Sequence, residues 1–191
     1  RAAPIAPRAP RCLVERVPLL QSKLVLVLRF APSDDPTTWV GRRLFTTLLG
    51  GGPRSRLFTE VREKRSLAYY ASASADRHTG IVLVQGGCDE AKASAVEEET
   101  QRQVAALGAG AFDDAELEIA RAQLVHALDT VGDSAATRCQ FVAENWLLGA
   151  DRTPEQLLAA YRAADKDLVV RSAQGLWQDF SYLLAPTEGG A

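Results

Sequence analysis

A chain of 191 residues with 47% apolar and 24% charged residues has the size and composition of one globular domain, which excludes a disordered chain. Its formal net charge of −2 creates no field that would recruit nucleic acid or an anionic membrane, so we expect neither as a partner. No apolar stretch approaches the ~20 residues that a membrane-spanning helix needs.

The start of the chain has the composition of a linker. Its first ten residues contain three prolines and no apolar periodicity, which is typical of an extended segment. We place a linker at residues 1–17, one domain at residues 18–186 and a short tail at residues 187–191. Because the chain begins with Arg1 and contains no Met, we expect it to be part of a longer protein with a domain upstream.

Residues 20–30 alternate between two faces, as in a strand. Leu24, Leu26 and Leu28 share one face, which we expect to be buried. The other face has β-branched residues between polar ends. This pattern indicates a border with a cavity or another domain rather than with open water.

The middle of the chain predicts two helices and a β-hairpin. Helical spacing, glycines and a polar turn mark the boundaries of these elements. In chain order they are a helix over residues 36–49, a shorter helix from an N-cap at Ser55 to Arg65, and strands over residues 67–75 and 81–88 joined by the turn Asp76–Gly80.

The remainder of the chain is mostly helical, and several helix starts carry capping residues. The predicted elements are helices from Asp89 to Leu107, from Asp113 to Val131, from Ser134 to Gly149, from Thr153 onward and from Asp165 to Trp177, then a short strand over Tyr182–Leu184. Strands and helices are thus segregated along the chain, and this order predicts an α+β fold.

The sequence has no metal-binding or nucleophile motif. Its two histidines, His78 and His126, lie in neither an HExxH nor an HxxEH arrangement. The run Gly50–Gly52 follows a helix and lacks the GK[ST] ending of a phosphate loop, so it indicates a helix end. We expect no catalytic residue, metal or other cofactor in this domain. The thiols, which form no CxxC pair and which we expect to be buried or inert, are Cys12, Cys88 and Cys139.

Residues 50–70 carry the densest set of charged side chains. Arg56, Glu60 and Lys64 stand four residues apart on the predicted helix, where we expect them to form surface ion pairs. Arg62 has no carboxylate three or four residues away on that helix. Its five hydrogen-bond donors are therefore left for another group.

Tyr69 follows Arg62 by seven residues and stands near the start of a predicted strand. A turn between the helix and the strand would bring its hydroxyl near the guanidinium. Both groups would then donate to one acceptor, such as a peptide carbonyl. The alternative is a solvated Arg62 and a Tyr69 that packs on the sheet.

The same segment, LGGGPRSRLFTEVREKRSLAYY, resembles one in the C-terminal, zinc-less half of M16 metallopeptidases, the group of pitrilysin and the mitochondrial processing peptidase. The resemblance continues through the turn Asp76–Gly80, the pair Gly86–Gly87 and the helix FDDAELEIARAQL, over roughly residues 18–185. It implies the fold of an M16 peptidase or LuxS-like metallohydrolase half: a mixed, mainly antiparallel sheet of about four to six strands with helices packed on one face.

In that family two homologous halves close like a clamshell. One half carries HxxEH and a distant glutamate around zinc, and the other contributes an arginine and a tyrosine that bind the substrate backbone. The resemblance gives these two substrate-binding places to Arg62 and Tyr69. It implies a zinc-bearing partner half, upstream in the same chain or on a separate subunit, and a peptide substrate. Tyr70 beside Tyr69 is more similar to zinc-less partner proteins, which leaves open whether the upstream half holds zinc.

Two functions follow from the resemblance. The first is the non-catalytic, substrate-binding half of an M16 zinc metallopeptidase, whose partner half hydrolyses the peptide bond. The alternative is a zinc-less M16-like structural or assembly subunit with no peptidase role, and a third hypothesis is an autonomous enzyme of unrelated chemistry. We expect a bacterial cytoplasmic location, with the periplasm left open because the native N-terminus is missing from this chain.

Overall fold

The computed structural model describes residues 6–33, 35, 37–147 and 152–187. One five-stranded sheet has the strand order β1-β5-β2-β4-β3. β1 pairs in parallel with β5, and the other neighbouring pairs are antiparallel. The predicted α+β fold with a mixed, mainly antiparallel sheet is therefore confirmed. The strands are β1 (Arg11–Val17), β2 (Ser22–Arg29), β3 (Tyr70–Asp76), β4 (Ile81–Cys88) and β5 (Trp177–Pro186).

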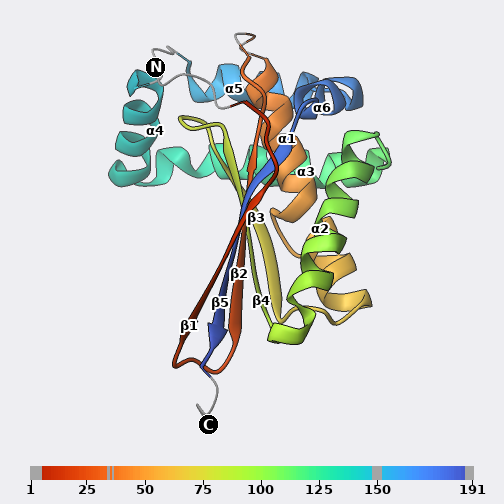
Figure 1. The fold of residues 1–191 in the computed structure, drawn as a ribbon. Coiled ribbons are helices and arrows are strands. Elements are labelled where there is room, and N and C mark those ends of the chain that lie inside the picture. Colours follow the sequence, from red (N-terminus) through yellow and green to blue (C-terminus); the bar gives the residue numbers. More distant parts are fainter. Residues whose placement is uncertain (1–5, 34, 36, 148–151, 188–191) are drawn as a thin grey trace.

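The helices pack beside the sheet, with α2 running down along its lower half, and the lower ends of β1, β2 and β5 extend beyond them (Figure 1). α1 packs on β3 and on α6, while α3 packs on α1 and on α5. The helices are α1 (Thr38–Gly50), the π-helix η1 (Leu57–Lys64), the 3₁₀ turn η2 (Glu90–Lys92), α2 (Ala93–Gly108), α3 (Asp114–Asp129), the 3₁₀ turn η3 (Thr130–Asp133), α4 (Ala135–Leu147), α5 (Pro154–Ala163) and α6 (Lys166–Ala173).

The core lies between the helices and the central strand β2. The alternation predicted for β2 is confirmed, because Leu24, Leu26 and Leu28 are at most 3% exposed. They join Leu44 and Phe45 of α1 in one continuous apolar cluster. Each fully buried leucine of this kind contributes about 1.5–3 kcal/mol to folding. The β2 side chains on the opposite face, from Lys23 to Arg29, range from half-buried to exposed.

Local capping explains where several helices begin. Asp113 and Glu116 form the predicted capping box of α3, in which each side chain accepts the other's backbone N–H. Thr153 and Gln156 do the same for α5. Ser134 accepts the N–H of Thr137 at 3.1 Å and begins α4 as predicted. The predicted end of that helix, Gly149, lies outside the described residues.

Residues 11–17 do not form part of a linker, because they form the edge strand β1. This strand pairs with β5 along its whole length. Six of its seven side chains are exposed, so no burial pattern marks it in the sequence. Main-chain hydrogen bonds to β5, which depend little on side-chain identity, hold it in place. The ion pair of Arg16 with Glu90, at 2.7 Å, adds to them.

The last helix is shorter and the last strand longer than predicted. α6 ends before Gly175, whose φ of 72° turns the chain toward β5. β5 spans Trp177–Pro186 instead of Tyr182–Leu184. The sequence of β5 does not show a clear strand pattern, because some of its polar side chains are buried together with their hydrogen-bonding partners. Asp179, only 1% exposed, accepts from Arg29 at 2.6 Å.

α1 ends where its backbone meets β3. A Cβ atom added to Gly50 would lie 2.2 Å from the main-chain nitrogen of Ala73, which cannot rotate away. We expect Gly50→Ala to lower the free energy of unfolding by about 3 kcal/mol in urea denaturation. The control is Gly108→Ala, since nothing lies within 4 Å of a Cβ atom there. Similar unfolding midpoints for the two variants would contradict the close approach.

Candidate functional site

The π-helix η1 carries Arg62 on its exposed side. Leu57 and Val61 anchor this helix, since both are fully buried. Arg62 stacks over the ring of Phe58, with its guanidinium carbon 4.6 Å from the ring centroid. Stacking of this kind contributes about 0.5–1 kcal/mol at an exposed site. Among the described residues no ion pair includes Arg62, so its donors remain available as predicted.

Tyr69 lies where the chain leaves η1 and approaches the sheet. Its backbone N–H donates to the carbonyl of Gly87 at 2.7 Å, and its side chain is 51% exposed. The phenol donates to Asp89 at 2.6 Å. The ammonium of Lys92 lies 3.3 Å from the same carboxylate and donates to the carbonyl of Ser66. These contacts connect the end of η1 to the start of α2.

The bond between Tyr69 and Asp89 changes the acidity of both groups. The hydrogen bond to Asp89, and then the carboxylate's charge, raise the pKa of the Tyr69 phenol above its ordinary value. The same hydrogen bond, followed by the one from Lys92, lowers the pKa of Asp89. The phenol therefore stays protonated at neutral pH. It can donate to a ligand only by leaving Asp89.

Arg62 and Tyr69 are both exposed, but each has its own partner. In the described part of the chain the two side chains share neither a hydrogen bond nor a ring contact. Their convergence on one acceptor stays a prediction. The sequence does not reveal Asp89 as the acceptor of Tyr69, and Asp89 occupies the predicted N-cap position, at the start of η2, without a side-chain cap. Its side chain makes no capping bond, because its carboxylate accepts from Tyr69.

Two other predictions for this segment are corrected. Ser55 does not cap η1, since its hydroxyl donates to the carbonyl of Gly52. Of the expected ion pairs, Lys64 and Glu60 pair at 2.6 Å, as predicted. Arg56 instead donates at 2.9 Å to Glu116, the capping-box residue of α3. Helical spacing shows which charges are neighbours on one helix and carries no information about a second helix packed beside it.

Tyr70 begins β3 and places its ring over Gly87 of β4. A Cβ atom at Gly87 would lie 2.4 Å from a ring carbon of Tyr70. The glycine therefore makes room for the second tyrosine of the pair, which remains 45% exposed.

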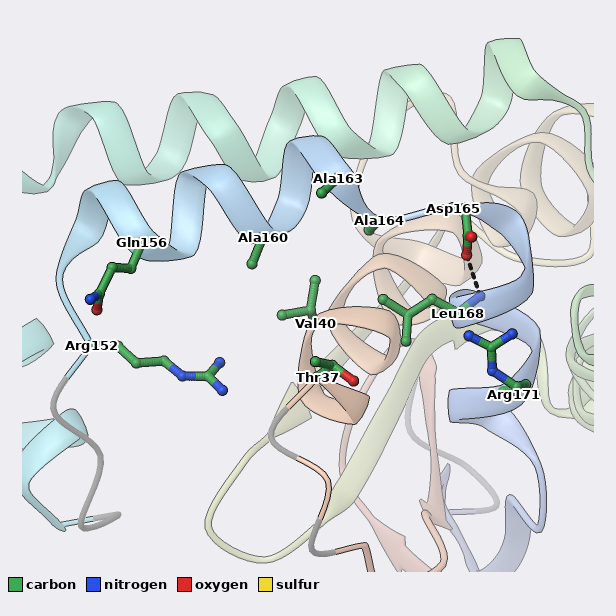
Figure 2. Close-up of a pocket in the computed structure, with 10 residues that line it drawn as sticks. All are labelled: Thr37, Val40, Arg152, Gln156, Ala160, Ala163, Ala164, Asp165, Leu168 and Arg171. Atoms are coloured by element: carbon green, nitrogen blue, oxygen red, sulfur yellow. Dashed lines mark hydrogen bonds between the residues drawn. The ribbon is translucent and has the colours of Figure 1, made fainter.

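Two cavities lie beside α5. The first, of about 530 Å³, is lined by α1, α5 and α6. Figure 2 shows Arg152 and Arg171 at opposite sides of it, with Val40, Ala160 and Leu168 between them. The second, of about 500 Å³, is lined by residues of α1, α3, α4, α5 and the β3–β4 turn.

Metal-ligating side chains do not gather in the described ranges. No group of three or more His, Cys, Asp or Glu side chains there is placed to hold a metal ion. Cys88 is buried, whereas Cys12 and Cys139 are exposed, and all three are free thiols. Within the same ranges no helix has the length and apolar character needed to cross a membrane.

The fold and the site define a class of protein: a two-layer α+β domain with an exposed arginine–tyrosine segment at one end of its hairpin. The family model of the peptidase M16 inactive domain matches residues 2–124. The chain therefore belongs to the M16 peptidase family, as an inactive domain.

Individual relatives agree with this assignment. The chain is 24% identical over 182 residues to "Probable inactive metalloprotease YmfF" of Bacillus subtilis (strain 168), covering 95% of this chain and 43% of that protein. A solved conserved protein from Enterococcus faecalis V583 matches with a TM-score of 0.88 and 27% identity, over 97% of this chain and 44% of that one. An inactive peptidase domain from Bordetella parapertussis matches with a TM-score of 0.73 and 19% identity, over 89% and 96% of the two chains, a likeness of fold alone. The chain thus spans less than half the length of the Bacillus relative.

The coupling of Tyr69 to Asp89 can be tested by titration. In Asp89→Asn, we expect the pKa of Tyr69 to fall toward the ordinary value of 10.0, because the charged acceptor is gone. NMR titration of the tyrosine ring carbons would measure it. Tyr182, whose pKa is raised by its hydrogen bond to Glu15, is the internal control and should not move. An unchanged Tyr69 in this variant would contradict the assigned hydrogen bond.

Proposed function

We propose that this chain is the non-catalytic, substrate-binding half of an M16 zinc metallopeptidase and that Arg62 and Tyr69 bind the substrate backbone. The observation that carries the proposal is an exposed guanidinium, on an M16 inactive domain, that no carboxylate of the described chain neutralises. Its stacking on Phe58 restricts the side chain before a ligand arrives. A restricted donor loses less conformational entropy on binding than a freely rotating one.

The chemistry of the two side chains suits a peptide carbonyl. Arg62 offers a fork of N–H donors, and Tyr69 offers one O–H donor that now points to Asp89. A substrate carbonyl, or the oxyanion that forms from it, would replace Asp89 as acceptor. Donors aimed at such an oxygen stabilise the charge that develops in hydrolysis. Activation of water by a bound metal ion would belong to the HxxEH-bearing partner half.

Two apolar surfaces support the proposal that a partner half packs against this domain, either fused upstream or present as a separate subunit. β2 presents half-buried Val25 and Val27 on the face opposite the helices, as expected for a face that borders a cavity or another domain. Val142 and Trp146 of α4 are 64% and 78% exposed. Apolar side chains that project this far often mark an interface. We propose a peptide substrate held between the halves, in the bacterial cytoplasm or the periplasm.

The role of the two residues can be measured as peptide hydrolysis. In the complex of this chain with an HxxEH-bearing M16 half, we expect Arg62→Ala and Tyr69→Phe each to lower kcat/KM by roughly 100-fold, since each removes a donor to the reacting carbonyl. Lys64→Ala is the matched control, because Lys64 lies on the same helix and pairs only at the surface with Glu60. Unchanged turnover in both variants would reject the proposed role.

A structural or assembly subunit without peptidase function is the second candidate. One observation favours it: Tyr69 already has an intramolecular acceptor, and Arg62 does not contact it. Titration with a fluorescent unfolded peptide separates the two functions. A substrate-binding half should bind the peptide saturably, and Arg62→Ala should weaken that binding about tenfold while Lys64→Ala leaves it unchanged. A scaffold should show no binding that depends on Arg62.

A further inference from the structure

The cavity between α3, α4 and α5 is lined by both apolar and basic side chains. Its volume is about 500 Å³, and its apolar lining includes Trp39 of α1, Leu128 of α3 and Phe141 of α4. Its polar lining includes Arg43 of α1, Arg77 of the β3–β4 turn and Tyr161 of α5. Small-molecule sites have this size and this mixture of apolar surface with a few polar groups.

Positive charge is concentrated around the phenol of Tyr161, which is only 3% exposed. Burial raises the pKa of this phenol, whereas the charge of Arg43, its hydrogen bond to the phenol, and the charges of Arg77 and Arg152 oppose that increase. Burial lowers the pKa of Arg77, and the nearby charge of Arg152 lowers it further. Three guanidinium groups from three separate segments therefore act on one buried hydroxyl.

Two of these arginines, Arg43 and Arg77, form no ion pair with an acidic group of the described residues near this cavity. Asp76 accepts from His78 and Thr79 within its own turn. Glu144 accepts from Gln140 on α4 and attracts Arg77 only at longer range. Among the described residues no ion pair within 4.0 Å includes Arg43 or Arg77. Partly desolvated cations without a counter-ion are costly, so the site favours an anion.

We propose that this cavity binds a small amphipathic anion, with a carboxylate or phosphate head between Arg43 and Arg77 and an apolar body against Trp39 and Phe141. Guanidinium groups suit both heads because their planar N–H forks match two oxygens at once. The apolar walls contribute by removing the ligand's hydrocarbon surface from water. The site is independent of Arg62 and Tyr69, which lie on other elements.

α4 is the wall through which a ligand can enter. It covers the cavity with Phe141 and Asn145, which are half-buried, and none of its side chains is fully buried. A helix with so few buried contacts opens at a low free-energy cost. Entry therefore requires no opening of the main core.

The proposal can be tested by titrating the 191-residue chain with octanoate, octyl phosphate and octanol. Tryptophan fluorescence, to which Trp39 contributes from the cavity wall, and thermal unfolding would follow each titration. We expect saturable binding of octanoate or octyl phosphate and at least tenfold weaker binding of octanol, which has the same chain without a charge. Comparison of the two charged probes identifies the preferred head group.

Charge-neutralising variants test the residues. Arg43→Gln and Arg77→Gln should each weaken binding of the charged probe about tenfold, because each removes a charged donor. Arg162→Gln, the same change on the exposed side of α5, should not weaken it. Thermal unfolding without ligand verifies that the variants fold. Tyr161→Phe leaves the net charge unchanged and serves as a further variant, for which we expect a smaller loss of affinity. Three results would each overturn the proposal. Octanol could bind as tightly as the charged probes, no probe could bind saturably up to about 10 mM, or both arginine variants could keep full affinity.

Discussion

The pairing of β2 with β4 on one side and β5 on the other organises this domain. β2 places its leucines toward the helices, and the register then determines which residues of the neighbouring strands face the same way. A shift of one residue would turn every side chain of a strand to the opposite face. The position of Gly87 and Asp89, and therefore of the tyrosine that meets them, depends on this register.

The arginine–tyrosine segment is held in two different ways. Its apolar side chains, Leu57 and Val61, are buried and anchor the π-helix in the core. Its polar side chains are held only by exposed contacts, Arg62 by an aromatic ring and Tyr69 by a carboxylate. Hydrogen bonds at the surface exchange readily with water or a ligand, because their net contribution is small. The backbone of the segment is thus anchored while its donors remain exchangeable, a combination that suits the binding role proposed for it.

The cavity beside Tyr161 also contains arginines, but these are less exposed to solvent than Arg62. Arg62 is exposed and stacked on its own helix, whereas Arg43 and Arg77 are half-buried and drawn from separate elements. Arginine suits both places because it keeps its charge even when partly removed from water. Of the 22 basic residues most are arginines, and their type alone does not distinguish a solvated charge from one inside a cavity.

By itself, the sequence determined the α+β class, the buried face of β2, the capping boxes at Asp113 and Thr153, and the segment that carries Arg62 and Tyr69. Each of these depends on residues close together in the chain, where periodicity and capping act directly. Only the tertiary structure decided the pairing of β1 with β5, the contact of Tyr69 with Asp89, the pairing of Arg56 with Glu116, and the gathering of three arginines around Tyr161. The physical reason is that these contacts join residues far apart in sequence, through main-chain bonds or charges whose partners are selected only when the layers pack together.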